Sequence, residues 1–524
     1  MDRKKLIFID EDNISWSSCL LITLLVYFVS HALMLSLYGA WWDDMLLWNV
    51  TPKMLYDFLG PDNFNNPVLY ETIKAITSIR ELKLQTFIFR LVAFVGNLIP
   101  IICAFFILRR ITAKKSQTLL VVCLMAACGV NKAMIFICCY HYTFSNALFF
   151  IGLVYFVNDY YKSTIINRVV YAVFWFLSLV VWRSPALLIP FVVCVASILK
   201  VPNFEYKKTD CYKKAFINAI SYYWPVILGC FVFVVLYKTI LAPHGVYEAY
   251  YRIGKKTLVL SPFSTVLSLL STITTYLGAL LLQTKQLLFV LVLLVPIYYI
   301  LNNSKLTFNT VNKKNIFMML GFAFFAFLPQ MLRNVSLGSN IDGYSSRQMS
   351  LELMPLSFLL YCFVSCFPKV LSKIIFSVLL SCSILYSINV YLDYNRYWAQ
   401  KESIAMFLEH NPQLEGKHID VVNAVPEYYA FSCEGDRNYD YEGCARLAYG
   451  AGTTTKMKEI DEEYADKEFN ANYCLYIHKN KELQSSIKLY LYRLFNKEKY
   501  RDLISDMISF DLYPIKGNEY KSNN

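Results

Sequence analysis

Charged residues are scarce in this chain, and that scarcity excludes a large soluble protein. Only 17% of the 524 residues are Asp, Glu, Lys or Arg, whereas an average soluble domain carries about 25%. Hydrophobic residues make up 56% of the chain, and its mean hydropathy is +0.40. This composition predicts an all-α polytopic membrane protein, because apolar helices satisfy their own backbone hydrogen bonds inside a bilayer.

Motifs for metal and nucleic acid are also missing. The fifteen cysteines show no zinc-site spacing, and most lie in apolar runs where they act as small hydrophobic side chains. No interleaved basic and aromatic motif is present. The net charge of +12 therefore indicates basic cytoplasmic loops and affinity for anionic lipid or phosphate, with no nucleic-acid partner. No small-residue cleavage site follows the first apolar run, which predicts an uncleaved anchor.

Apolar runs recur along most of the chain, and about eleven of them are candidates for transmembrane helices. Short basic loops fall between them, and the positive-inside rule then places the N-terminus in the cytoplasm. The predicted spans lie at about 17–38, 86–108, 117–139, 144–158, 168–182, 185–200, 216–241, 286–301, 316–332, 351–368 and 371–391.

Three loops are expected on the extracytoplasmic side of the membrane part, which covers residues 1–391. Residues 39–85 and 333–350 are two of them. Residues 242–283 are partly apolar, but the lysine-bearing loop that follows favours keeping them outside, as helices that lie on the membrane or dip into it. Two short spans or a re-entrant hairpin are the alternatives for this stretch.

The composition changes after residue 391, and no later run could span a bilayer. Residues 392–524 are predicted to form a small soluble α/β domain on the extracytoplasmic side. An alternating segment from His418 and a second from Asn472 are typical of strands, and residues 483–494 favour an amphipathic helix. Cys433 and Cys444 could form a disulfide in an oxidising space, and two free thiols fit the sequence equally well.

Two adjacent acids, Asp43 and Asp44, follow the first predicted span among several tryptophans. Ionisable groups at a membrane face are costly unless they have a function, although two solvated loop residues would have the same spacing. Neighbouring carboxylates repel, so one of them can titrate high. We therefore expect two roles: one acid accepts a proton, and the other binds acceptor hydroxyls or a cation.

The other polar groups expected on the outer face are mainly cations and aromatic residues. Arginine and lysine stabilise phosphate oxygens as charge develops. Each group also has a structural interpretation, such as snorkelling to the interface, packing, or unspecific lipid contact. The candidates are Trp42, Lys132, His141, Tyr142, Arg183, His244, Tyr247, Arg252 and Arg347.

This layout resembles the GT-C superfamily of integral-membrane glycosyltransferases. The resemblance rests on an inner N-terminus, one span, and an outer loop that opens with Trp41-Trp42-Asp43-Asp44. It is most similar to bacterial members that use polyprenyl-phosphate sugars to decorate cell-surface glycans. The Trp-Trp-Asp-Tyr-Gly signature of oligosaccharyltransferases is absent from the tail, which argues against protein N-glycosylation.

The resemblance implies inverting transfer of a sugar from undecaprenyl or dolichyl phosphate to a hydroxyl of a glycan, lipid or protein. It implies Asp43 as the general base and Asp44 as an orienting or assisting group. Membrane lipids, the donor and the acceptor are the expected partners, in a bacterial inner membrane with the site on the extracytoplasmic face. No cofactor is required, although a divalent metal is possible. The donor phosphate would bind Arg183, Arg347, Arg252 and Lys132, and the sugar or acceptor would contact Trp42, His141, Tyr142, His244 and Tyr247.

Three other functions remain open. A flippase or transporter for lipid-linked saccharides predicts charged groups at mid-membrane and internal symmetry, whereas these spans are poor in charge and no repeat is detected. An O-antigen-type polymerase or ligase would depend more on outer-loop arginines than on an early acidic pair. A non-catalytic membrane scaffold is the third alternative.

Overall fold

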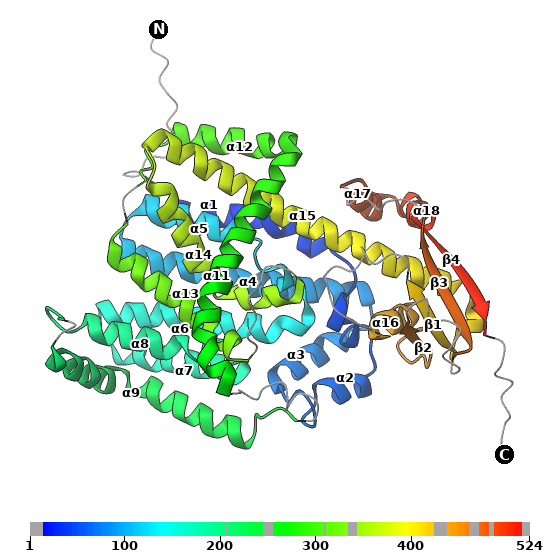
Figure 1. Cartoon of the computed structure of the whole chain (residues 1–524), viewed down its shortest axis with the longest axis horizontal. Helices are drawn as coiled ribbons and strands as arrows, with labels where there is room; N and C mark the ends of the chain where they lie inside the picture. The colour runs from blue at the N-terminus through cyan, green and yellow to red at the C-terminus, as the bar shows by residue number, and fades with distance from the viewer. Residues whose placement is uncertain are drawn as a thin grey trace, which may run out of the picture.

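The computed structural model describes residues 14–205, 208–244, 255–308, 311–333, 343–423, 438–460, 471–480 and 487–515. A few side chains within these ranges, including those of Trp42 and Asp43, lie outside the description. Helices dominate the described chain, and a small sheet stands at one end of the molecule (Figure 1).

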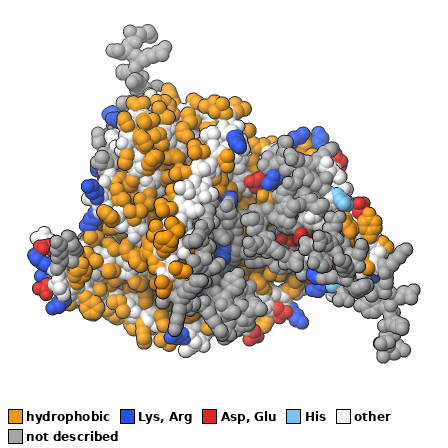
Figure 2. Space-filling model, viewed as in Figure 1, with side chains coloured by type: hydrophobic (Ala, Val, Ile, Leu, Met, Phe, Trp, Pro, Cys, Tyr) orange, Lys and Arg blue, Asp and Glu red, His pale blue; other side chains and the backbone are white. Residues whose placement is uncertain are grey.

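Most of the mass is a bundle of apolar helices. Hydrophobic side chains cover a broad face of this bundle, and charged side chains gather toward its two ends (Figure 2). The bundle helices are α1 Trp16–His31, α4 Leu82–Thr112, α5 Lys115–Ala127, α6 Tyr140–Tyr161, α7 Ile165–Val181, α8 Leu188–Leu199, α9 Thr209–Thr239, α11 Lys255–Leu282, α12 Leu287–Asn302, α13 Lys313–Arg333, α14 Leu353–Ser365 and α15 Lys369–Glu409.

Among the described residues, seven helical stretches are long and apolar enough to cross a membrane, and four shorter apolar helices accompany them. This supports an integral, multi-pass membrane protein. It does not confirm the expected count of eleven spans, and the sidedness stays a prediction. The seven are Trp16–Ser36, Leu82–Thr112, Ile137–Tyr161, Thr209–Thr239, Val259–Asn302, Lys313–Leu332 and Lys369–Glu409.

The predicted span 117–139 is wrong in its second half. Helix α5 ends at Ala127, and the chain then forms two short 3-10 helices, η3 Lys132–Ile135 and η4 Ile137–Cys139. Nearly all of these residues are buried. Hydropathy reports burial in protein and burial in lipid alike, so it extended the helix through a buried irregular segment. Such a segment is tolerated at membrane depth only where protein surrounds it.

Within 242–283, where helices that lie on the membrane or dip into it were expected, residues 255–282 form one long helix, α11. Residues 245–254 lie outside the described chain. Helix α11 runs at a steep angle to α12 and α15, and its contacts are mainly with α13 (Figure 1). Its placement relative to the bilayer stays a prediction.

The predicted boundary at residue 391 falls inside helix α15, which runs unbroken from Lys369 to Glu409. The helix carries the chain out of the bundle and packs under the C-terminal sheet (Figure 1). The strand order is β2-β1-β3-β4, with β1 parallel to β2 and β3, and β3 antiparallel to β4. The predicted strands at His418 and Asn472 correspond to β1 and β3. The elements of this region are η7 Pro412–Leu414, β1 His418–Asn423, α16 Asn438–Tyr449, β2 Lys456–Glu459, β3 Tyr473–Lys479, α17 Ile487–Phe495, α18 Lys497–Met507 and β4 Ile508–Pro514.

Two short helices in the first connecting segment have clear local causes. The side chain of Thr51 caps α2, and that of Asn66 caps α3, each followed by proline at the first helical position, where its missing N–H costs nothing. Asn66 also donates through Nδ2 to the carbonyl of Val181 at 2.9 Å. This bond fixes α3 against the end of α7. The remaining short elements are η1 Ala32–Ser36, η2 Trp42–Leu46, α2 Pro52–Leu59, α3 Pro67–Thr77, η5 Gln283–Gln286 and η6 Gly343–Ser350.

Candidate functional site

The stretch 39–49, which holds Asp43 and Asp44 and is called the acidic segment below, is packed against α15. Gly39 has a φ of +114°, and a Cβ at this position would overlap the indole of Trp398. Only glycine combines that backbone conformation with so close an approach. The ring of Trp398 also lies 6.3 Å from that of Trp41 and 5.3 Å from that of Trp48. Helix α15 thus sets the path of the chain on both sides of the acid pair.

The C-terminal region holds the same segment from another side. Arg446 of α16 is buried and donates to the carbonyl of Met45, and Asn49 donates to the carbonyl of Arg446 at 2.9 Å. Arg493 of α17 donates to the carbonyl of Tyr38, also at 2.9 Å. The tail expected as a separate soluble domain therefore forms one wall around the acidic segment.

Asp44 is completely buried and bound to η4, the short helix that precedes α6. Its Oδ1 accepts a hydrogen bond from the backbone N–H of Cys138 at 2.9 Å, and its Oδ2 has no hydrogen-bond partner among the described residues. The guanidinium of Arg90, which is also fully buried, acts on this carboxyl electrostatically. Asp44 therefore does not lie in bulk solvent, as the alternative of a solvated loop would require.

Arg90 ties three segments together around Asp44. It donates to the carbonyl of Ile135 at 2.6 Å and to the carbonyl of Gly39. Its guanidinium lies over the ring of Trp41, 4.7 Å from the centroid. A buried arginine is retained in an apolar helix when its donors are satisfied and an opposite charge is near. The terminal nitrogens of Arg90 are satisfied by the first loop and the segment before α6, and Asp44 supplies the opposite charge, whereas Nε has no hydrogen-bond partner among the described residues.

Burial raises the pKa of the Asp44 carboxyl from its ordinary value to about 7. Desolvation is the largest cause, while the Arg90 guanidinium and the N–H groups of Cys138 and Ile137 act to lower the pKa. A group poised near neutrality can hold or release a proton within the working range of an enzyme.

This raised pKa predicts a specific pH dependence of stability. The unfolded chain loses the Asp44 proton near its ordinary pKa of about 4, whereas the folded protein keeps the proton up to about 7. The stabilising contribution is therefore complete below about pH 4, decreases as the pH rises, and is lost above about pH 7. The difference in unfolding temperature between wild type and Asp44→Asn, followed by a thermal-shift assay in detergent, should change in this window. A pH-independent difference would contradict the raised pKa.

A second group of predicted residues gathers at the start of α6, directly after Cys138. The ring of His141 lies 4.2 Å from that of Trp182 and 4.5 Å from that of Tyr142. Arg347 donates through Nε to the hydroxyl of Tyr142 at 3.4 Å. Arg183 lies 5.5 Å from the Trp182 ring. Four predicted residues, His141, Tyr142, Arg183 and Arg347, thus form one aromatic and cationic wall with Trp182.

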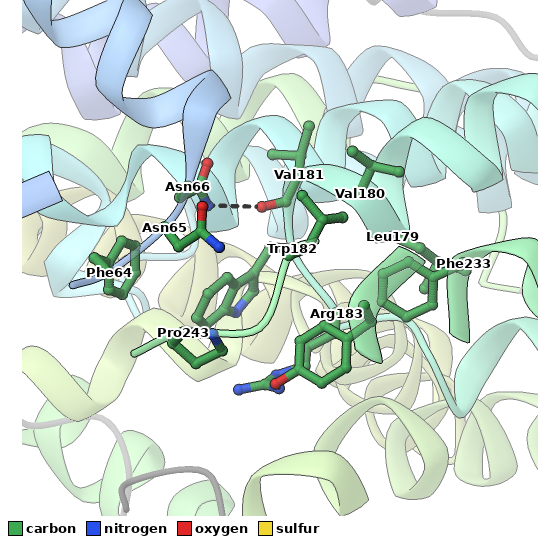
Figure 3. Close-up of a pocket in the computed structure, with 12 residues that line it drawn as sticks. Phe64, Asn65, Asn66, Leu179, Val180, Val181, Trp182, Arg183, Phe233 and Pro243 are labelled. Atoms are coloured by element: carbon green, nitrogen blue, oxygen red, sulfur yellow. Dashed lines mark hydrogen bonds between the residues drawn. The ribbon is translucent and has the colours of Figure 1, made fainter. Parts of the chain in front are cut away.

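Arg183 stands at the mouth of a narrow cleft (Figure 3). Its guanidinium donates to the hydroxyl of Tyr237 on α9, and Phe64 stacks on Trp182 at 5.8 Å. The innermost space is about 30 Å³, which holds one or two water molecules. The cleft is lined by Phe64, Asn65, Asn66, Leu179, Val180, Val181, Trp182, Arg183, Phe233, Tyr237, Leu241 and Pro243.

The remaining candidates make other contacts or lie outside the described side chains. The ammonium of Lys132 lies 5.7 Å from the ring centroid of Tyr386 on α15. His244 is exposed, and its backbone N–H donates to the carbonyl of Asn63 at 2.9 Å. Four candidate side chains and one cysteine fall outside the described residues, so their roles and the proposed disulfide stay predictions. They are Trp42, Asp43, Tyr247, Arg252 and Cys433.

Arg90 is a residue of this site to which sequence reasoning assigned no role. It lies within the long apolar helix α4, where a charged side chain is costly and marks either a function or a buried partner. That signal was present in the sequence. The identity of its partner was not, because Gly39 and Arg90 are 51 residues apart in the chain.

Metal binding is not decided by the described side chains. Among them, no group of three or more His, Cys, Asp or Glu residues could hold a metal ion. Asp43 is not among those side chains, so the possibility of a divalent metal stays a prediction.

Comparisons with known proteins add one weak likeness. No protein-family profile and no curated protein matches the sequence. One solved structure, described as ArnT from Cupriavidus metallidurans bound to undecaprenyl phosphate, aligns over 92% of this chain and 94% of that chain. The identity is 10% and the TM-score is 0.35, so this likeness does not assign the chain to a family or an activity.

Proposed function

We propose that this protein is a membrane glycosyltransferase that moves a sugar from a polyprenyl phosphate to a hydroxyl of a cell-surface glycan or lipid-linked acceptor. The observation that carries the proposal is the position of the acid pair. Asp44 is hydrogen-bonded to Cys138 in η4 and lies in the field of Arg90, and the aromatic and cationic wall begins at His141, in the first turn of the helix that follows. This arrangement supports an acid and cations that act together.

The two acids have different roles in this proposal. Asp44 is completely buried and bound to backbone, so it positions the segment and does not contact an acceptor. Asp43 is the proposed general base, which takes the proton from the acceptor hydroxyl as oxygen attacks the anomeric carbon. The bond from that carbon to the donor phosphate breaks in the same step, and the polyprenyl phosphate leaves.

The arginines of the wall would stabilise the phosphate as it leaves. Arg183 and Arg347 each bind a tyrosine hydroxyl, that of Tyr237 and of Tyr142 respectively. These contacts hold the guanidinium groups in place before the substrate arrives. Charge-assisted hydrogen bonds to a developing phosphate dianion are the main means by which such groups accelerate transfer.

An apolar cavity beside the wall could take the isoprenoid chain. It has a volume of about 480 Å³ and lies between α11, α13 and the start of α14. Its walls are almost entirely hydrophobic apart from Glu352 and Thr272. Met349 of η6, the segment that carries Arg347, lines the cavity. Apolar walls with a few polar groups at one end are typical of sites for lipid-like ligands.

The proposal is tested by binding and by transfer. Undecaprenyl phosphate, the leaving group shared by every sugar donor of this class, should bind the purified protein in nanodiscs. Arg183→Gln and Arg347→Gln should each weaken that binding about tenfold to a hundredfold, because each removes a charge-assisted hydrogen bond. Arg110→Gln is the matched control, since Arg110 is exposed at the other end of α4.

Transfer of radiolabelled sugar from a panel of undecaprenyl-phosphate donors to extracted cell-surface glycan would complete the test. Equal binding by wild type and both wall variants would contradict the assignment of the arginines. Tight binding with movement of the lipid across the membrane, but no transfer with any donor, would favour the flippase alternative.

A further inference from the structure

Helix α17 has an apolar face that the rest of the described chain leaves exposed. Ile487, Leu491 and Leu494 are each 42% exposed, and Phe495 is 81% exposed. Their spacing puts all four side chains on one face of the helix. The opposite face is buried, because Leu489 packs into the core of the C-terminal domain. An amphipathic helix of this kind needs a partner for its outer face.

A cationic hollow of about 490 Å³ adjoins this face. Lys83 comes from the first turn of α4, whereas Lys497 and Arg501 lie one turn apart on α18. Leu494 lines the same hollow, so the apolar face and the cations meet there. None of the three cations forms an ion pair with a described carboxylate. Lys83 lies close enough to Lys497 to lower the pKa of its ammonium.

Acidic groups near the hollow do not neutralise it. Two carboxylates, Glu402 and Glu409, line it together with four cations, the fourth being Arg493. Glu402 already accepts a hydrogen bond from the hydroxyl of Tyr500 at 3.0 Å. The hollow therefore keeps an excess of positive charge, which favours an anionic ligand.

Lys83 lies at the end of a row of exposed apolar side chains on α4. Directly after it, helix α4 exposes Leu84, Phe87 and Val95, each between 44% and 45%. Such a row on a membrane-spanning helix faces lipid chains. A lysine at the end of the row is at the depth of lipid headgroups. Leu494 lines the same hollow as Lys83, which puts the apolar face of α17 beside that lysine.

We propose that α17, the first turns of α18 and Lys83 together form a docking surface for anionic phospholipid. The apolar face of α17 enters the boundary between headgroups and acyl chains, with Phe495 deepest, and Lys83, Lys497 and Arg501 bind the phosphate groups. This surface is separate from the wall at Arg183, and the inference does not depend on the proposed function.

Lipid bound at this surface would affect the acidic segment indirectly, through hydrogen bonds made by the inner face of α17. The hydroxyl of Tyr490 is hydrogen-bonded to Ser36, and Arg493 donates to the carbonyl of Tyr38 and to Asn395. Ser36 and Tyr38 directly precede the acidic segment. A helix held in place by lipid would therefore also restrain the start of that segment.

The test compares a double variant on α18 with a double variant that has one change on α17 and one on α18. Lys497→Gln/Arg501→Gln removes cations that line the hollow, whereas Lys488→Gln/Lys499→Gln removes cations that lie against the ring of Tyr492. Native mass spectrometry would measure the phosphatidylglycerol retained by each protein. We expect about a tenfold loss for the first variant and little change for the second. Phosphatidylcholine and inorganic phosphate serve as comparison ligands.

Hydrogen exchange on the wild-type protein gives a readout that needs no variant. The amides of α17 should exchange more slowly in nanodiscs containing phosphatidylglycerol than in nanodiscs of phosphatidylcholine alone. Equal losses in the two double variants, or equal exchange in the two kinds of nanodisc, would overturn the proposal. Displacement of phosphatidylglycerol by millimolar inorganic phosphate would also overturn it, because the site would then bind free anions and not lipid.

Discussion

Replacement of Arg90 with methionine is expected to lower the free energy of unfolding by about 3–5 kcal/mol, the usual cost of removing one member of a buried charged pair. Two causes add. The carbonyls of Ile135 and Gly39 lose their donor and stay buried, at about 1–3 kcal/mol each. Asp44 also loses the Arg90 guanidinium, the positive group that acts to lower its pKa. Thermal unfolding in detergent would measure the effect.

A double-mutant cycle separates these two causes. Adding Asp44→Asn to Arg90→Met should recover only the part that came from the unpaired carboxyl, because the two carbonyls still lack a donor. Arg110→Met is the matched control on the same helix, since Arg110 is exposed and its loss should change stability by less than about 0.5 kcal/mol. An Arg90→Met protein that unfolds like the wild type would show that the arginine does not hold the site together.

Replacement of Asp43 with asparagine is expected to reduce sugar transfer by about 10²–10⁴-fold, the contribution typical of a general base. Asparagine has nearly the same shape but does not accept the proton, so folding should be unchanged. Transfer from an undecaprenyl-phosphate donor, with thermal unfolding measured on the same preparation, would test both statements. The expected loss is in the rate of the chemical step, with binding of undecaprenyl phosphate retained.

Asp44→Asn is the matched comparison for Asp43→Asn. An amide oxygen can still accept the hydrogen bond from the N–H of Cys138, so transfer should decrease less than in Asp43→Asn. The opposite order would exchange the two roles and make Asp44 the base. Normal transfer by both variants would leave the proposed mechanism without a proton acceptor.

Arg347 and Tyr142 show how far the sequence could predict the candidate site. Both were expected on the outer side, together with His141 and Arg183, because each follows or precedes an apolar run. The structure brings these four residues to one wall. Lys132 had the same signal in the sequence, yet its ammonium faces Tyr386 on α15. Loop position predicts the end of the bundle at which a residue lies, but not the neighbour that it meets.

Helix α15 shows a similar limit for the fold. Hydropathy predicts a span at 371–391, and the polar residues that follow predict the start of another domain. The helix continues to Glu409 because its later residues, including Trp398, pack against the first loop and the C-terminal domain. A polar helix of this kind is stabilised by neighbours distant in the chain, and hydropathy averages contain no information about them.

The sequence by itself determined that the chain is rich in apolar helices, that an acid pair follows the first of them, and that strands occur near His418 and Asn472. Those features depend on local composition and on the period of hydrophobic residues, which are written along the chain. Only the tertiary structure decided that Arg90 acts electrostatically on Asp44, that Trp398 requires Gly39, and that α16 and α17 hold the acidic segment. These contacts join residues far apart in the chain, so they depend on how the helices pack and not on the pattern within any one of them.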